Sequence, residues 1–347
     1  MDMKAVTRRA FMRLGAVVGL GALAAPTRAL ADIGFGSATR EGSRHKVVST
    51  QFLMGTFVTI TVVDDSKHRA EQGIGEAYAA IKRLCTVLDR HTAGTEASHL
   101  NAAGRIAGAH PDMVAVVRGA RDMATLTGGA FDPTVLPVVE YLREQGKAVS
   151  VGDIPRSELA EVLRLVDASA LECTGRDIRF TREGMQATLD GIGKGYIVDR
   201  AAEALAGAGV GSYMVNAGGD IRVGGDKTWT VAIEDPAGQG HYPAVLNLRD
   251  CAVATSGGYE QPFDAKGTLH HVVNPATGIS PVQSVSVSVV GRTVMEADAL
   301  ATAAFVMDAK HGVWSIESLP GRECMVLAAS GAKLQSSGWA RLERRSA

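Results

Sequence analysis

Glycine is the feature that most restricts how this chain can fold. It occupies 40 of the 347 positions, well above its usual share of about 7%. Glycine tolerates positive φ and lets a backbone approach a neighbour or a ligand closely. The glycine clusters are Gly191–Gly195, Gly207–Gly211, Gly218–Gly219, Gly224–Gly225 and Gly257–Gly258. These clusters are therefore the first places to look for sharp turns and ligand contacts.

The rest of the composition is that of a folded protein with a substantial core. A hydrophobic content of 46% and a charged content of 21% exclude an intrinsically disordered chain. No motif recurs at a fixed period, which excludes a repeat array. The formal net charge of -1 gives no positive footprint for a phosphate backbone, so we expect no nucleic-acid partner.

The first 31 residues have the pattern of an export signal. Arg8 and Arg9 precede the uncharged apolar run Leu14–Ala25, which is shorter than the roughly 20 residues of a membrane span. A small-x-small cleavage site follows at Ala29–Ala31. The paired arginines resemble a twin-arginine (Tat) signal, with an ordinary Sec signal as the alternative. We expect a periplasmic protein whose mature chain has no transmembrane segment.

The mature chain is predicted to form one catalytic domain. No Pro- or Ser-rich linker divides it, so we assign 32–46 to an N-terminal segment, 47–340 to the domain and 341–347 to a tail. Four cysteines are widely spaced without a Cys-x-x-Cys pair, which argues against zinc or iron–sulfur ligation. We favour buried free thiols over one disulfide for Cys85, Cys173, Cys251 and Cys324.

Hydrophobic periodicity predicts an α+β fold with a largely antiparallel sheet and flanking helices. Helices are expected at 68–90, 111–126, 156–166, 196–206, 296–307 and 313–318. Strands are expected on both sides of Met54-Gly55-Thr56 and at 213–216, 220–223, 228–234, 244–248, 253–255, 271–274, 285–290 and 325–328, with short strands near Ile178 and at 186–189.

Two glycine clusters invite comparison with phosphate-binding loops. Gly207–Gly211 follows a predicted helix and precedes a strand, which is the wrong context for a dinucleotide-binding loop. Gly191–Gly195 places Lys194 among glycines before a predicted helix. Backbone amides at a helix N-terminus and a lysine suit an anion, although the spacing is not that of a Walker motif.

Three further side chains are candidates for chemistry. His271 leads into a predicted strand that ends at a Pro-Ala-Thr-Gly turn; it is either a proton shuttle or a structural histidine. Asp298 and Thr302 are four residues apart on a predicted helix, so both oxygens lie on one face. They suit a hard cation such as Mg²⁺, or Asp298 simply stabilises the helix start.

Taken in order, the motifs resemble the FAD:protein FMN transferases, the ApbE-type flavin transferases. The resemblance extends over about residues 47 to 340, and the matching segments are Met54-Gly55-Thr56, Ser98-x-Leu100-Asn101, Gly129–Thr134, Asp190–Asp199, Asn216–Asp220, Ala254–Gly257, His271–Gly278, and Glu296–Ala299 with Thr302. It implies an ApbE-like, T-fold type architecture. It also implies that FAD is split at its pyrophosphate, FMN passes to a Thr or Ser hydroxyl of an acceptor flavoprotein, and AMP leaves with the help of Mg²⁺.

The same resemblance assigns roles to individual residues. The Mg²⁺ ligands would be Asp298, the Thr302 hydroxyl and the main-chain carbonyl of Gly193. His271 would act as general base, and Lys194 would support the phosphates. The FAD site would be lined by Met54, Phe131, Asp132, Gly219, Asp220, Thr255, Ser256, Gly257 and His271.

Two positions depart from the family pattern. Gly258 stands where Asp is common, which puts one contact near FAD in doubt, and Asn274 stands where Asp is commonest before Pro. The chain has no acceptor motif of its own, so we expect it to modify another protein, by analogy a periplasm-facing domain of a membrane redox complex. The alternatives are an Mg²⁺-dependent FAD pyrophosphatase and a periplasmic FAD carrier.

Overall fold

The computed structural model describes residues 35–146, 152, 154–236 and 240–344, so the predicted export signal lies outside the described residues. Its centre is a nine-stranded sheet in which every neighbouring pair is antiparallel. In spatial order the strands are β1 (Phe35–Glu41), β2 (Arg44–Leu53), β3 (Thr56–Asp64), β7 (Ser212–Ala217), β8 (Asp220–Gly225), β11 (Cys251–Ser256), β12 (Ser284–Gly291), β13 (Glu323–Ala328) and β14 (Lys333–Gln335). The predicted fold class is confirmed.

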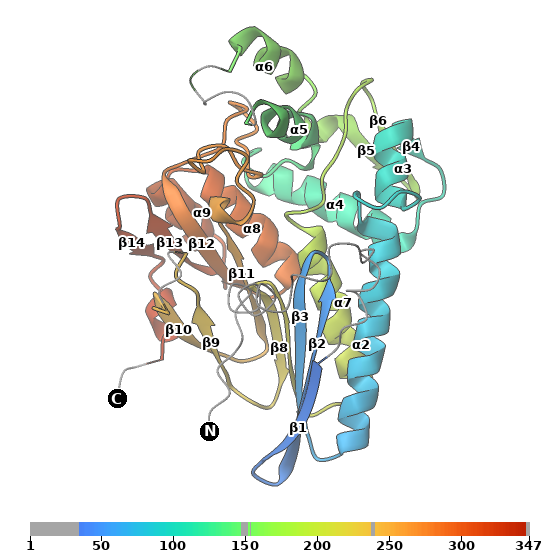
Figure 1. The fold of residues 1–347 in the computed structure, drawn as a ribbon, viewed down its shortest axis with the longest axis vertical. Helices are drawn as coiled ribbons and strands as arrows, with labels where there is room; N and C mark the ends of the chain where they lie inside the picture. The colour runs from blue at the N-terminus through green and yellow to red at the C-terminus, as the bar shows by residue number, and fades with distance from the viewer. Residues whose placement is uncertain (1–34, 147–151, 153, 237–239, 345–347) are drawn as a thin grey trace, which may run out of the picture.

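Four helices cover one face of this sheet (Figure 1). They are α2 (Lys67–Leu88), α7 (Gly193–Gly207), α8 (Val294–Val306) and α9 (Ala309–Glu317). The apolar side chains of α2 recur every three or four residues, and the positions from Ile74 to Leu88 that predicted this helix are buried. Helix α8 is buried almost all round because α7, α9 and the sheet all pack against it.

A small hairpin packs against the opposite face. It consists of β9 (Trp229–Ile233) and β10 (Ala244–Leu248). Alternate residues of β9 are buried, as expected for a half-exposed strand, and they form one apolar cluster with residues of β8, β11 and β12. The short helix η6 (Trp339–Arg341) adds the fully buried Trp339 to that cluster.

The remaining elements gather at one end of the molecule, at the top of Figure 1. They are α3 (Glu96–Ala103), α4 (Pro111–Leu126), α5 (Leu136–Gln145), α6 (Arg156–Leu163), the short helices η2 (Pro133–Val135) and η4 (Ala168–Ala170), and a three-stranded sheet of β4 (Arg105–Ile106), β6 (Asp177–Phe180) and β5 (Leu171–Thr174). Helices α5 and α6 share a separate apolar cluster with the loop that contains His271.

Two predicted strands are wrong. Residues 271–274 form no strand; Val272 and Val273 are buried by packing, and Asn274 closes a turn by accepting the Gly278 N–H at 2.8 Å. Residues 186–189 form no strand either. There the Asn101 side chain replaces a strand partner, because it bonds both the N–H and the carbonyl of Ala187, at 2.8 and 2.9 Å.

The four cysteines are all free thiols in the structure. Burial raises the pKa of Cys85 to about 11 and that of Cys324 to about 12. Thiols with such a pKa are poor nucleophiles at neutral pH.

Among the described residues, no helix combines the length and apolar character required to cross a bilayer.

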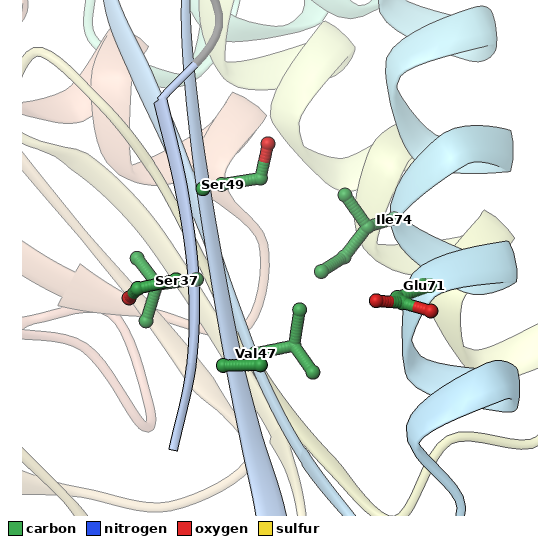
Figure 2. A pocket seen from close by; sticks show the side chains of 8 residues that line it. Ser37, Val47, Ser49, Glu71 and Ile74 are labelled. Atoms are coloured by element: carbon green, nitrogen blue, oxygen red, sulfur yellow. The ribbon is translucent and has the colours of Figure 1, made fainter.

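An open groove of about 390 Å³ lies between the β1–β2 ribbon and α2. Figure 2 shows Ile74 and Glu71 reaching from α2 towards the strands, with Val47 facing them. The remaining lining consists of glycine, alanine, valine and two serines. None of the residues predicted to bind FAD or Mg²⁺ lines this groove, so the candidate site lies elsewhere.

Candidate functional site

Two tight turns meet at one end of the large sheet. Met54 and Gly55 join β2 to β3 with φ of 53° and 69°, and Gly218 and Gly219 join β7 to β8 with φ of 65° and 105°. The turns touch, because a Cβ on Gly218 would lie 2.6 Å from Thr56 Oγ1. A methionine at positive φ is uncommon, and such strained residues concentrate at functional sites.

The start of α7 is pressed against α8. A Cβ on Gly195 would lie 2.6 Å from the Val294 carbonyl oxygen, so only glycine allows this approach. Asp199, one turn further along α7, stabilises the same contact by accepting the N–H groups of Val294 and Met295, both at 2.9 Å. We did not single out Asp199 from the sequence, although it closes the Asp190–Asp199 motif.

A buried charged cluster lies at this contact. Lys194 Nζ is 3.2 Å from Asp220 Oδ2, and the Gly195 N–H donates to Asp298 Oδ2 at 3.3 Å. Asp220 and Asp298 are 1% and 5% exposed. The structure thus brings together three predicted site residues from three elements: Lys194 on α7, Asp220 on β8 and Asp298 on α8.

The electrostatics of the cluster disfavour the ionised forms of both carboxylates. Burial, and then the charge of Asp220, raise the pKa of Asp298 well above its usual value. Burial also raises the pKa of Asp220, against the opposing charge of Lys194. Burial alone would lower the pKa of Lys194, but the two carboxylates outweigh it and raise that pKa. One ammonium group faces two buried carboxylates, so a further cation would be stabilising here.

The predicted Mg²⁺ ligands fit such a cation chemically. Asp298 and Thr302 are one turn apart on α8, and Gly193 is buried at the first turn of α7. A carboxylate, a hydroxyl and a carbonyl are the hard oxygen donors that Mg²⁺ prefers. Within the described part of the chain, no group of three or more His, Cys, Asp or Glu side chains is arranged to hold a metal; the predicted set uses one carboxylate and two other oxygens.

Small hydroxyl and aromatic groups surround Thr302. Its hydroxyl lies 3.1 Å from Ser256 Oγ at the end of β11. A Cβ on Gly191 would be 3.1 Å from Thr302 Oγ1 and 3.3 Å from Phe131 Cε2, so the loop before α7 is packed against both. Thr255 bonds instead to Ser288 Oγ on β12, at 2.8 Å.

His271 lies on the loop between β11 and β12 and is partly buried. Its backbone N–H donates to the Gln261 carbonyl at 3.3 Å, while its buried Nδ1 has no hydrogen-bond partner in the described residues. Burial and the charge of His270 lower the pKa of His271 to about 4, with Asp190 opposing the shift. The ring is therefore neutral at pH 7 and can accept a proton.

Two residues predicted to contact FAD form hydrogen bonds within the protein. Asp132 accepts the N–H and hydroxyl of Thr134 with one oxygen and the Ala168 N–H with the other, at 2.5 to 2.9 Å. Gly219 donates its N–H to Asn216 Oδ1 at 3.1 Å within the turn. Their contact with FAD, like that of Met54 and Gly257, stays a prediction.

The glycine at position 258, where the family pattern commonly has Asp, has a local explanation. A Cβ there would lie 2.5 Å from the His270 ring. That ring is fixed by a 2.9 Å contact between Nε2 and the Pro281 carbonyl and by edge-to-face packing on Phe305, with centroids 5.7 Å apart. His270 thus occupies the space in which a side chain at Gly258 would have to lie.

The fold and the cluster together define an α+β protein with a buried, oxygen-rich polar site at the junction of a sheet end and two helices. The chain belongs to the ApbE family, whose family model matches residues 54–326. The resemblance inferred from the motifs is confirmed.

Individual relatives agree with this assignment. The chain is 30% identical, over 319 residues, to a protein of Treponema pallidum named FAD:protein FMN transferase; the match covers 83% of this chain and 84% of that one. A Vibrio cholerae protein of the same name is 33% identical over 57% of this chain and 61% of its own length. The crystal structure of the ApbE protein of Thermotoga maritima superposes with a TM-score of 0.77 at 26% identity, covering 86% of this chain and all of that one.

Proposed function

We propose that this protein is an FAD:protein FMN transferase that requires Mg²⁺, modifies a Thr or Ser hydroxyl of an acceptor flavoprotein and releases AMP. The observation that carries the proposal is the Lys194–Asp220–Asp298 cluster, in which two buried carboxylates lie beside one ammonium group and a bound cation would stabilise their ionised forms. The names of the relatives support the transfer of FMN from FAD to a protein.

The binding part of the mechanism follows from the oxygen donors. Asp298, Thr302 and the Gly193 carbonyl would hold Mg²⁺, which when bound lowers the charge barrier to attack on a pyrophosphate. Lys194 lies in the first turn of α7, where its ammonium and the positive end of the helix dipole favour a phosphate anion. Charge neutralisation and positioning are what phosphoryl transfer chiefly requires.

His271 is the residue we assign to the proton. Its neutral ring takes the proton of the acceptor hydroxyl as that oxygen forms a bond to the FMN phosphorus. The bond between this phosphorus and the bridging oxygen breaks, and AMP leaves with the electron pair. A low pKa in the free protein suits this role once the negative charge of FAD is nearby, because that charge raises the pKa of His271.

The acceptor and the compartment remain inferences from the sequence. The twin-arginine pattern at 1–31 supports export to the periplasm. We therefore propose an acceptor domain that faces the periplasm, as in a membrane redox complex.

One assay tests the function and the metal site together. The purified protein is mixed with FAD, Mg²⁺ and a candidate acceptor domain; AMP is followed by chromatography and the acceptor by mass spectrometry. We expect AMP and an FMN-sized adduct, with rates at least about 100-fold lower in Asp298→Asn because several kcal/mol of charge stabilisation are lost. Asp122→Asn, at an exposed position on α4, is the matched control and should behave as wild type.

The other outcomes separate the alternatives. AMP and free FMN without an adduct, for every acceptor tested, would indicate an FAD pyrophosphatase in which water replaces the hydroxyl. FAD that binds without any AMP being formed would indicate a carrier and would contradict the catalytic assignment.

A further inference from the structure

Arg90 is a buried arginine that joins two acidic residues from distant parts of the chain. Its side chain is 10% exposed. Nε donates to Asp190 Oδ2 at 3.0 Å, Nη2 lies 2.9 Å from the same oxygen, and Nη1 donates to Glu140 Oε1 at 3.2 Å. Arg90 follows α2, Glu140 lies on α5, and Asp190 lies in the loop before α7. The guanidinium therefore links three separate elements.

The charged contacts continue to the loop of His271. Arg143, one turn along α5, donates to both oxygens of Glu140, at 2.9 and 2.8 Å. Its guanidinium carbon lies 5.2 Å from the centre of the Phe263 ring, within the range of a cation–π interaction. Phe263 donates its N–H to the Leu269 carbonyl at 2.7 Å, within the segment that leads to His271.

The other end of this chain of contacts reaches the charged cluster. Asp190 immediately precedes Gly191, which is packed against Thr302, and it lies four residues before Lys194. The alternating series Asp190–Arg90–Glu140–Arg143 thus connects the segment of the predicted metal and phosphate residues with the segment of the predicted base.

Stability alone is a weak reason for such an arrangement. Both partners of Arg90 are exposed to solvent, Glu140 by 39% and Asp190 by 49%, and ion pairs with exposed partners contribute little to stability. A planar guanidinium whose nitrogens contact two different carboxylates, however, fixes direction as well as distance.

We propose that Arg90 is a positioning residue for the transfer reaction, holding Asp190 and the His271 loop in a fixed relation across the site. This inference rests on the proposed function, in which His271 is the base. We assign Arg90 to positioning and not to substrate contact, because all three of its guanidinium nitrogens face Asp190 or Glu140.

The arrangement predicts that removing the charge of Arg90 and removing the charge of Asp190 shift the pKa of His271 in opposite directions. The charged or titratable groups that act on this ring are His270, Asp190 and Lys194. Neutralising Arg90 leaves the negative charge of Asp190 less compensated, which raises the pKa of His271. Neutralising Asp190 removes a charge that raises the pKa of His271, so that pKa falls. The Asp190 side chain is half-exposed, so solvent stabilises its carboxylate when Arg90 is replaced.

The test compares Arg90→Met, Arg90→Lys and Asp190→Asn with wild type. The control is Arg164→Met, which removes an arginine from an exposed pair with Glu161 on α6. Four quantities are measured: kcat and KM for FMN transfer, the acid limb of the pH profile, FAD affinity, and the His271 titration by NMR, assigned with His271→Gln.

We expect Arg90→Met to lower kcat roughly 10- to 100-fold through misplacement of the base, with FAD affinity and the thermal midpoint little changed. The His271 titration should move up by about 0.5 pH unit in Arg90→Met and down by a similar amount in Asp190→Asn. Arg90→Lys should retain the titration of wild type but recover only part of kcat, since lysine keeps the charge and loses the planar group that contacts both Asp190 and Glu140.

Two results would overturn the proposal: an unchanged His271 titration in both charge-removing variants, or a loss of kcat that merely follows loss of folded protein. The NMR titration needs no turnover, so it tests the role of Arg90 even if wild type forms no adduct. Absence of the adduct would contradict the proposed function and not the role of Arg90.

Discussion

At the scale of single residues, the clearest electrostatic feature outside the site is Asp64. This fully buried carboxylate accepts four hydrogen bonds, from the Ser66 N–H, two guanidinium nitrogens of Arg69 and the Gly211 N–H, at 2.7 to 3.1 Å. Burial alone would raise the pKa of Asp64, but these bonds outweigh it and lower that pKa. The carboxylate thereby ties the end of β3 to the start of α2 and to the residue before β7.

Replacing Asp64 should therefore cost stability in a pH-dependent way. We expect Asp64→Asn to lower the free energy of unfolding by about 2 kcal/mol at pH 7, since charge-assisted bonds are lost. Because the folded pKa lies below the unfolded value of about 3.9, the difference from wild type is full above that value and shrinks as the pH falls through the folded pKa. Urea denaturation at several pH values measures it.

The neighbouring carboxylate provides the control. Asp65 is 74% exposed and only 3.4 Å from Arg44 in a surface ion pair, so Asp65→Asn should change stability by less than about 0.5 kcal/mol. Equal effects of the two substitutions, or an Asp64→Asn effect that does not vary between pH 7 and pH 3, would show that Asp64 is not held as an ionised acceptor.

Residue roles were predictable from sequence where they depend on local spacing. The four-residue interval between Asp298 and Thr302 placed both on one face of α8. The partnership of Lys194 with Asp220, by contrast, joins α7 to β8 through space, and Arg90 gave no sequence signal at all. No periodicity encodes which distant charge will lie beside a buried one.

At the scale of elements, prediction succeeded where apolar spacing and end signals agreed. The helix Pro111–Leu126, with proline at its start, and the strand Ala244–Leu248 have the predicted bounds. Helix α7 begins at Gly193, three residues before the prediction, because glycines conceal a helix start. The two wrong strands were apolar segments buried in loops, and burial alone does not distinguish a loop from a strand.

The contact between α7 and α8 gives the second prediction, at Gly195. We expect Gly195→Ala to force the helices apart, since its methyl group would lie 2.6 Å from the Val294 carbonyl oxygen. Overpacking of this kind costs about 1–3 kcal/mol, and here it also displaces Asp298 from the Gly195 N–H. Thermal unfolding and Mg²⁺ titration by calorimetry should both show a loss.

A second glycine of the same helix is the matched control. A Cβ on Gly207 would meet nothing within 4 Å, so Gly207→Ala should leave Mg²⁺ binding intact and stability unchanged or slightly higher. If Gly195→Ala bound Mg²⁺ as wild type does, the close approach of α7 and α8 would not define the cation site.

At the scale of the whole molecule, the fold class followed from the order of elements, but the sheet order did not. Strands β3 and β7 are neighbours in the sheet. In sequence they are separated by the six helices from α2 to α7 and by the small three-stranded sheet. Local patterns predict that a segment is a strand and not which strand it will pair with. Only the family resemblance, whose motifs lie at the ends of these strands, gave information about the arrangement of the sheet.

The same sheet must be covered on its second face, and the end of the chain contributes to that cover. Trp339 is fully buried beneath β9 and β10, and the Arg344 N–H donates to the Val245 carbonyl at 2.7 Å. We expect Trp339→Ala to lower the free energy of unfolding by about 3–5 kcal/mol, the usual cost of removing a buried aromatic side chain. Trp314 on α9 is 69% exposed, so Trp314→Ala should cost less than about 0.5 kcal/mol. Urea denaturation followed by circular dichroism compares the two, and a loss below about 1 kcal/mol for Trp339→Ala would mean that the second face is stable without this segment.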